Sequence, residues 1–247
     1  MVTQSRAEPV PLLLTRPKAQ GADFAERLIA RFGDAVAIIN TPLLAPRFFV
    51  PNLPIGPFDA MILTSQTGVA GYVRLGLADT LPKAVYCVGE RTANAAQDAG
   101  LNVVAVAPDA ARLIAQIKAS RVKGVLLHLR GRETRGNIVS LLESAGIDTV
   151  EAVIYAQDPV PLADAAIRCL QCAQPMVVPL FSPRTAALFS VELARIQAVS
   201  PLFIAAMSGE VALELGFTGA QIKIAHRPDA GAMVDAVALL LADLLRA

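Results

Sequence analysis

Residues suited to binding an anion recur at similar points of this sequence, directly after short apolar runs. Small hydroxyl residues and glycines stand at these points, and arginines accompany several of them. The six segments are Thr15-Arg16-Pro17, Thr64-Ser65-Gln66-Thr67-Gly68, Val88-Gly89-Glu90-Arg91-Thr92, Leu129-Arg130-Gly131-Arg132, Phe181-Ser182-Pro183-Arg184-Thr185 and Met207-Ser208-Gly209. Free backbone N–H groups at helix N-termini attract anions, and glycine lets a ligand come close to the backbone. Together these segments predict binding of a small polyanion.

The same residue types are also those that begin helices. Serine and threonine are preferred N-caps, and Ser182 followed by Pro183 is a typical N-cap with proline at the first helical position. For any single residue, capping alone is therefore a sufficient explanation. Only the recurrence of the pattern at several strand ends favours a ligand site.

Other kinds of chemistry find little support in the residues. Cys169 and Cys172 have redox spacing but lie late in an expected helix, where a thiolate gains nothing from the helix dipole. His128 and His226 are isolated, so each is expected to pack or polarise a strand end, and no cysteine, histidine or acidic cluster has metal-binding spacing. No dinucleotide, P-loop or nucleophile-elbow motif follows the first strand. We therefore expect neither a metal nor a cofactor.

Composition excludes further classes. The 247 residues are 54% hydrophobic with a formal net charge of +1, which argues against a general nucleic-acid-binding surface. The longest uninterrupted apolar piece near the C-terminus, residues 236–242, is far short of the roughly 20 residues that span a membrane. Three cysteines cannot form a closed disulfide framework, so a reducing cytoplasm is the expected location.

Short apolar runs alternate with helical patterns along the whole chain, which predicts parallel sheets covered by helices on both faces. The expected strands are Val10–Thr15, Val36–Ile39, Ala60–Thr64, Val85–Val88, Val103–Val106, Val125–Leu129, Thr149–Tyr155, Val177–Phe181, Leu202–Ala205 and Ile222–Ala225. Between Thr41 and Pro57 five prolines surround Phe48 and Phe49, and this segment is expected to be an extended connector.

An internal repeat favours two sheets over one. Leu63-Thr64-Ser65 before a helix matches Leu180-Phe181-Ser182 before a helix, and Pro108-Asp109-Ala110 matches Pro228-Asp229-Ala230. The order and spacing of these matches predict two related α/β units. We expect a discontinuous outer domain, residues 1–42 plus 157–247, and a central domain, residues 43–156, that includes the linker strands.

Several short motifs, kept in order over nearly the whole chain, resemble those of the uroporphyrinogen-III synthase family. They are Leu13-Leu14-Thr15-Arg16-Pro17, Leu63-Thr64-Ser65 with Val69, Tyr86-Cys87-Val88-Gly89 with Thr92-Ala93, Arg130-Gly131, Val153-Ile154-Tyr155, Phe181-Ser182-Pro183-Arg184-Thr185-Ala186 and Ala205-Ala206-Met207-Ser208.

The resemblance implies an α/β fold of two flavodoxin-like parallel-sheet domains joined by a two-stranded linker, in a monomeric enzyme without cofactor. It implies a cyclising lyase that converts hydroxymethylbilane, a linear tetrapyrrole with many carboxylates, to uroporphyrinogen III. Water is lost and the terminal (D) ring is inverted. The upstream hydroxymethylbilane synthase is a further expected partner. Because the bilane is intrinsically reactive, the enzyme's main task is to hold one conformation and to screen a cationic intermediate.

Roles for single residues follow from the same resemblance. Tyr155 would assist departure of the hydroxyl group, and Thr92 would orient it. The predicted substrate-binding residues are Arg16, Ser65, Gln66, Gly89, Arg130, Gly131, Ser182, Arg184, Ser208 and Gly209. One departure is Val211, which stands where the family often has a threonine facing the substrate.

Two other functions stay open on the residues alone. The first is a non-enzymatic two-domain hinge protein that closes on a small anionic ligand. The second is an enzyme of the nucleotide-sugar type, although the acidic motif that holds a metal and a diphosphate is missing. A binding protein would return its ligand unchanged, and a sugar-transfer enzyme would need a nucleotide.

Overall fold

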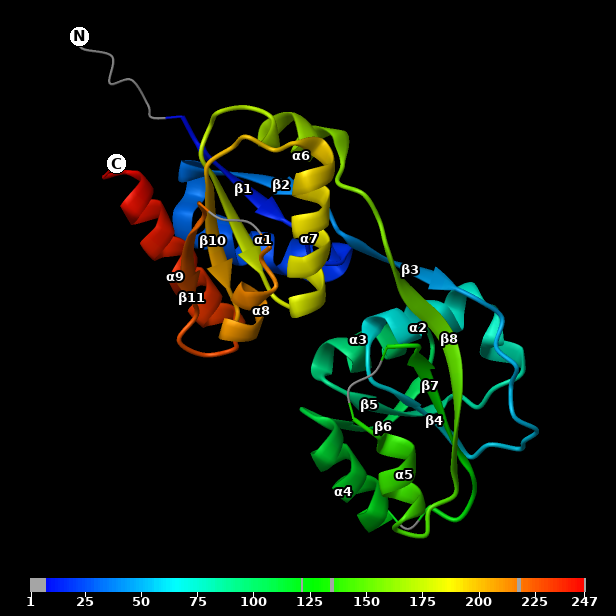
Figure 1. The fold of residues 1–247 in the computed structure, drawn as a ribbon. Helices are drawn as coiled ribbons and strands as arrows, with labels where there is room; N and C mark the ends of the chain where they lie inside the picture. Colours follow the sequence, from blue (N-terminus) through cyan, green and yellow to red (C-terminus); the bar gives the residue numbers. More distant parts are fainter. Residues whose placement is uncertain (1–7, 121, 134–135, 217–218, 247) are drawn as a thin grey trace. The chain divides into compact units, whose positions relative to one another are not determined.

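The computed structural model describes residues 8–120, 122–133, 136–216 and 219–246. The chain divides into two compact units, unit 1 with residues 1–45 and 159–247 and unit 2 with residues 46–158. Each unit is built around its own sheet, five-stranded in unit 1 and six-stranded in unit 2 (Figure 1). The prediction of two parallel sheets in an α/β fold is therefore confirmed.

Unit 1 has the strand order of flavodoxin-like sheets, β11-β10-β9-β1-β2, and its neighbouring strands pair in parallel. The strands are β1 (Val10–Leu14), β2 (Val36–Asn40), β9 (Met176–Leu180), β10 (Leu202–Ala206) and β11 (Gln221–Ile224). The helices are α1 (Lys18–Phe32), η1 (Gly33–Ala35), α6 (Asp164–Leu170), α7 (Pro183–Ile196), α8 (Gly209–Leu213) and α9 (Ala230–Leu244).

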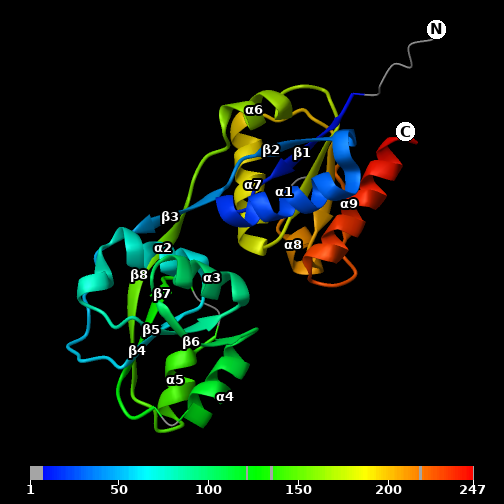
Figure 2. The ribbon, with the colours of Figure 1, turned by 180° about the vertical axis from the view of Figure 1, so that it is seen from behind.

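Helices cover both faces of this sheet. Phe24 and Leu28 of α1 share one apolar cluster with Met233 and Val237 of α9. Phe189 of α7 belongs to a second cluster, on the opposite face, together with residues of α6 and α8. Figure 2 shows α1 and α9 on the near side of the sheet, whereas Figure 1 shows α7 and α8 there.

Unit 2 has the strand order β3-β8-β7-β4-β5-β6. Its strands are β3 (Leu44–Phe48), β4 (Ala60–Leu63), β5 (Ala84–Val88), β6 (Asn102–Ala107), β7 (Leu126–Gly131) and β8 (Thr149–Pro159). Its helices are α2 (Gln66–Arg74), η2 (Leu77–Asp79), α3 (Glu90–Asp98), α4 (Ala110–Ser120) and α5 (Ile138–Glu143). Residues of α2 and α3 pack with one face of the sheet, and residues of α4 and α5 pack with the other.

The two units share one spatial plan that the chain follows in different orders. Strands β9, β10 and β11 lie side by side in unit 1 as β4, β5 and β6 do in unit 2. On the other side of β9 lie β1 and then β2, just as β7 and then β8 lie on the other side of β4. The first pair of strands in unit 1 therefore corresponds to the last pair in unit 2. This circular shift agrees with the repeat in the sequence, which pairs the end of β4 with the end of β9.

The ten expected strands are all present within one to four residues of their predicted ends, but the sequence analysis missed β3. That strand lies in the proline-rich segment expected to be an extended connector, and Pro46 is part of it. Because β3 is the edge strand of its sheet, it tolerates a residue without a backbone N–H group. The backbone N–H of Val160 donates to the carbonyl of Leu43, and the backbone N–H of Phe49 donates to the carbonyl of Ile154. Strands β3 and β8 therefore run antiparallel.

Helix α2 packs closely on the strands that lead to the site. A Cβ atom at Gly71 would lie 2.8 Å from Cδ1 of Ile154 and 3.2 Å from Cδ1 of Phe48. At Gly21, inside α1, the nearest atom would be 3.4 Å away, which is ordinary contact. Both glycines lie inside helices, so replacing either with alanine gains a similar helix propensity of about 1 kcal/mol.

We therefore predict that Gly71→Ala is less stable than its matched control Gly21→Ala by about 1–3 kcal/mol, because only the former overpacks the core. Urea unfolding followed by circular dichroism measures both free energies of unfolding. Equal stability of the two variants would contradict the close packing of α2 on β3 and β8.

Candidate functional site

The site in unit 2 lies at the switch point of its sheet, where the direction in which the chain adds strands reverses. From β4 the chain proceeds to β5 and β6 on one side, whereas β7 and β8 lie on the other. In open parallel sheets, ligands bind beyond the carboxyl ends of the strands at such a switch point. Ser65 and Gly131 lie at the carboxyl ends of β4 and β7, and Tyr155 reaches the same place from β8.

A hydrogen bond joins two of the predicted site residues. The hydroxyl oxygens of Ser65 and Tyr155 are 2.9 Å apart. Ser65 is also the N-cap of α2, and its Oγ accepts from the backbone N–H of Gly68 at 3.0 Å. The Ser65 side chain therefore both caps α2 and contacts Tyr155. When Oγ accepts from Gly68 and donates its own proton to Tyr155, the phenol proton is left for a ligand.

Tyr155 is held in a narrow space and is 8% exposed. A Cβ atom at Gly131 would lie 2.7 Å from Cε2 and Cζ of the tyrosine ring, so only glycine leaves room for it. Burial raises the pKa of Tyr155, the hydrogen bond from Ser65 lowers it, and the charge of Glu133 raises it. With its pKa raised overall, the phenol stays protonated at neutral pH and can donate a hydrogen bond.

A cavity of about 310 Å³ opens beside this pair. Its polar lining comes from residues at or just beyond the carboxyl ends of β4 and β7 and from His128 and Tyr155 within β7 and β8, and its apolar lining includes the first residues of α4 and α5. The described lining residues are Thr64, Ser65, Val88, Ala110, His128, Gly131, Glu133, Gly136, Ile138 and Tyr155. Three of the predicted site residues, Ser65, Gly131 and Tyr155, therefore meet at one cavity.

Thr92 and Gly89 lie at the next strand end and do not line this cavity. Gly89 is the N-cap of α3 with a φ of 81°, a conformation that favours glycine. Thr92 is the third residue of α3 and is 5% exposed. The orienting role of Thr92 stays a prediction.

Arg130 and Gln66, two further predicted site residues, are not among the residues that line this cavity. The guanidinium of Arg130 pairs with Glu151 on β8 and donates to the carbonyl of Gly131 at 2.9 Å. This pairing lowers the pKa of Glu151. Gln66 lines a separate surface hollow with Phe48 and Arg74. Carboxylate binding by either residue stays a prediction, and Arg130 would have to share its charge with Glu151.

In unit 1, the predicted residues lie at the ends of β1 and β9, which form the corresponding switch point. The guanidinium of Arg16 lies 3.9 Å from the ring centre of Phe181, and that ring packs edge-on against Phe24. Ser182 is the N-cap of α7, accepting from the backbone N–H of Thr185 at 3.2 Å. Arg184 is exposed in the first turn of α7.

The end of β10 carries Ser208, Gly209 and Val211. Ser208 precedes α8 as its N-cap, but its side chain makes no capping hydrogen bond. Val211 is 1% exposed and belongs to the apolar cluster beneath α7 and α8. A valine at this position is therefore part of the core, whereas the family's threonine is expected to face the substrate.

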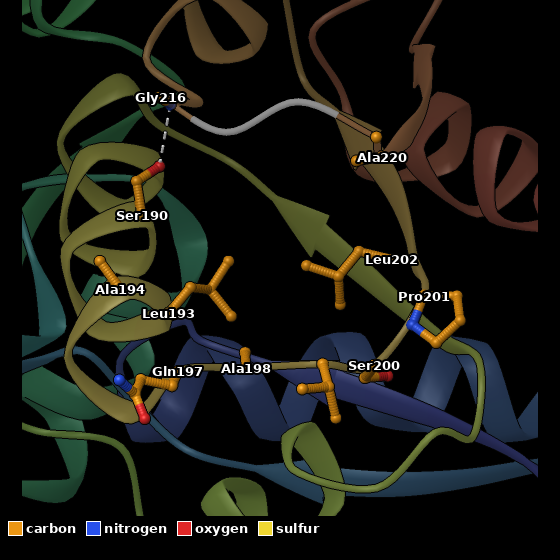
Figure 3. Close-up of a pocket in the computed structure, with 12 residues that line it drawn as sticks. Ser190, Leu193, Ala194, Gln197, Ala198, Ser200, Pro201, Leu202, Gly216 and Ala220 are labelled. Atoms are coloured by element: carbon orange, nitrogen blue, oxygen red, sulfur yellow. Dashed lines mark hydrogen bonds between the residues drawn. The ribbon is translucent and has the colours of Figure 1, made fainter.

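A larger cavity of about 490 Å³ lies near the amino-terminal end of a unit 1 strand, where β10 begins (Figure 3). The end of α7 and residues 198–202 form its walls, with Leu193, Ala194 and Leu202 among the apolar lining. Ser190 Oγ accepts from the backbone N–H of Gly216 at 3.3 Å across one side of it. It contains none of the predicted site residues.

Among the titratable residues that line the unit 2 cavity, sequence reasoning missed His128 and Glu133. His128 could have been found from the sequence, because it is a histidine on an otherwise apolar strand, three residues before the predicted Gly131. Among the residues that the structure describes, no group of acidic, cysteine or histidine side chains could hold a metal ion. No helix within the described ranges is long and apolar enough to cross a membrane.

Comparison with known proteins identifies the family. The model of the uroporphyrinogen-III synthase HemD family matches residues 23–235. No curated protein matches the chain. The crystal structure of uroporphyrinogen-III synthetase from Helicobacter pylori is similar with a TM-score of 0.59 at 19% identity, covering 94% of this chain and 99% of that one.

A second solved structure, a mutant uroporphyrinogen III synthase from Thermus thermophilus, has a TM-score of 0.45 at 14% identity. The match covers 95% of this chain and 99% of that one. The match to the family model spans most of the chain, including the Ser65–Tyr155 pair. The chain therefore belongs to the uroporphyrinogen-III synthase family, and its function is that family's closure of a tetrapyrrole ring in porphyrin biosynthesis.

Proposed function

We propose that the chain acts as a cyclising hydro-lyase on hydroxymethylbilane and that Tyr155 donates the hydrogen bond that assists departure of the substrate hydroxyl. The observation that carries this proposal is the Ser65–Tyr155 hydrogen bond at the switch point of unit 2. In the step, a pyrrole nitrogen supplies the electron pair that expels the hydroxyl, and the C–O bond breaks. The oxygen departs as hydroxide stabilised by the hydrogen bond from the phenol, and it becomes water by taking the proton that the unsubstituted α-carbon of the terminal ring loses when the macrocycle closes.

The environment of Tyr155 suits donation without full ionisation. Its raised pKa makes the phenolate unfavourable, so the phenol polarises the departing oxygen and keeps its own proton. Such assistance is enough because the pyrrole supplies most of the driving force. A preorganised donor at the right place then contributes through positioning and local electrostatics.

The residues of unit 1 support binding of the carboxylates. Arg16 holds its guanidinium against Phe181, and Ser182 begins α7 beside the exposed Arg184. Guanidinium groups and the first N–H groups of a helix are both suited to carboxylates. We propose that Arg16, Ser182, Arg184 and Ser208 bind carboxylate side chains of the bilane, and that Thr92 orients the departing group.

The cellular setting follows from the same chemistry. The bilane also closes without enzyme and without ring inversion, so direct transfer from the upstream hydroxymethylbilane synthase would protect it, and we propose that enzyme as a partner. The cysteines Cys87, Cys169 and Cys172 are free thiols, which supports the proposal of a reducing cytoplasm.

The function is tested by supplying purified protein with fresh hydroxymethylbilane, oxidising the product and separating the uroporphyrin isomers. We expect isomer III from the wild type, and a kcat about 10²-fold lower for Tyr155→Phe, which removes the donor and keeps the ring. Tyr86→Phe is the matched control, because Tyr86 lies on β5, faces α4 and does not line the cavity. Isomer I alone at the uncatalysed rate would favour the binding-protein alternative. Full activity of Tyr155→Phe would overturn the role of Tyr155.

The contact between Gly131 and Tyr155 gives a second test. An alanine at Gly131 would push on Cε2 and Cζ of the ring, so Gly131→Ala should lower kcat by about ten-fold or more by displacing the phenol. In a Tyr155→Ala background the same change should cost nothing further, because the ring that it displaces is gone. Steady-state kinetics of the two single variants and the double variant measure this. Equal losses in both backgrounds would contradict an effect through Tyr155.

A further inference from the structure

Arg132 follows directly after β7 and places a positive charge beside the proposed reaction site. Its backbone N–H donates to the carbonyl of Tyr155 at 2.8 Å, which fixes its position next to β8. Its two neighbours in the sequence, Gly131 and Glu133, both line the cavity of about 310 Å³. The side chain of Arg132 is exposed and therefore open to a ligand. No step of the proposed function uses this cation.

The guanidinium of Arg132 lies over an aromatic ring and has no counterion. Its central carbon is 5.4 Å from the ring centre of Phe49. In the part of the chain that the structure describes, no carboxylate forms an ion pair with it. Arg47 lies over the same ring at 5.6 Å, but its charge is neutralised by Asp158, to which it donates a hydrogen bond. Two guanidinium groups and one carboxylate at this ring leave one positive charge, that of Arg132, uncompensated.

An exposed guanidinium over an aromatic ring is suited to a carboxylate. The ring restricts the orientations of the guanidinium, so less side-chain entropy is lost when a ligand binds. The planar group can then donate two parallel hydrogen bonds to one carboxylate. Glu133, the acidic residue next to Arg132 in the sequence, lines the cavity, and its carboxylate accepts from the backbone N–H of Gln157 at 3.2 Å. Arg132 is therefore available for a carboxylate of a ligand.

We propose that Arg132 binds a carboxylate of the pyrrole ring that carries the hydroxymethyl group, while that ring lies at the cavity next to Tyr155. The proposal deepens the proposed function and rests on it, because Tyr155 is proposed to assist departure of the hydroxyl from the same ring. The carboxylates of the bilane are on short flexible side chains, so a ring at the cavity reaches a cation beside it. Arg132 binds the substrate, and Phe49 is the positioning residue that holds the guanidinium.

Arg132→Gln and a matched control test the proposal by steady-state kinetics on hydroxymethylbilane, with isomer III as the measured product. The control is Arg31→Gln, because Arg31 is also exposed and lies over an aromatic ring, that of Phe32 at 5.9 Å. Arg31 is in the last turn of α1, at the end of the helix opposite to the one that follows β1. We expect KM of Arg132→Gln to rise about 3- to 10-fold at nearly unchanged kcat, because a carboxylate remote from the breaking bond is bound equally in the ground and transition states. Arg31→Gln should keep both constants.

Two further readouts separate substrate binding from a structural role of Arg132. Salt screens an exposed charge, so the wild-type KM should rise more steeply with NaCl concentration than the KM of Arg132→Gln. Arg132→Lys keeps the charge but not the planar group, so its KM should lie between those of the wild type and Arg132→Gln. A lower Tm of Arg132→Gln with an unchanged KM, a loss confined to kcat, or an equal rise of KM in Arg31→Gln would overturn the proposal.

The same experiment distinguishes failure of this proposal from failure of the proposed function. If the wild type makes no isomer III, the proposed function fails, and the role of Arg132 fails with it. If the wild type makes isomer III while Arg132→Gln keeps the wild-type KM, only the role of Arg132 fails.

Discussion

In a parallel sheet the carboxyl ends of the strands all point the same way. In unit 2 this constraint brings Ser65 and Tyr155 together although they are 90 residues apart in the sequence. Strand β7, which ends at Gly131, lies between β4 and β8, and it carries no side chain at the point where the tyrosine ring passes. The hydrogen bond, the raised pKa of Tyr155 and the cavity all depend on this arrangement. A one-residue shift of β8 would turn Tyr155 to the other face of the sheet.

The two units share one sheet plan and carry different residues at their switch points. The switch point of unit 1 presents Arg16 on an aromatic ring and a capped helix start, a combination suited to carboxylates. The switch point of unit 2 presents hydroxyl groups, a neutral histidine and a carboxylate, which suits a pyrrole ring and a developing positive charge. The strand orders of the two sheets are related by a circular shift along the chain.

Local patterns in the sequence were sufficient for most of the fold and for part of the site. Short β-branched and aliphatic runs predicted ten strands, and Ser65 and Ser182 were correctly considered as helix caps. Strand β3 was missed because its proline is tolerated only at a sheet edge, a place that the sequence alone does not reveal. The ion pair of Arg130 with Glu151 depends on the register of β7 and β8, so it was invisible before the structure. The same register places His128 at the cavity.

Ser65 and Tyr155 are proposed to act as one unit, and a double-mutant cycle on kcat/KM for isomer III tests this. Ser65→Ala also removes the cap of α2, but that cost is the same in both backgrounds and cancels in the cycle. Because Ser65 acts through the phenol, Ser65→Ala should lower kcat/KM more in the wild-type background than in the Tyr155→Phe background, where only the cost of the lost cap remains. Losses that multiply, with no coupling between the two positions, would show that Ser65 and Tyr155 act independently.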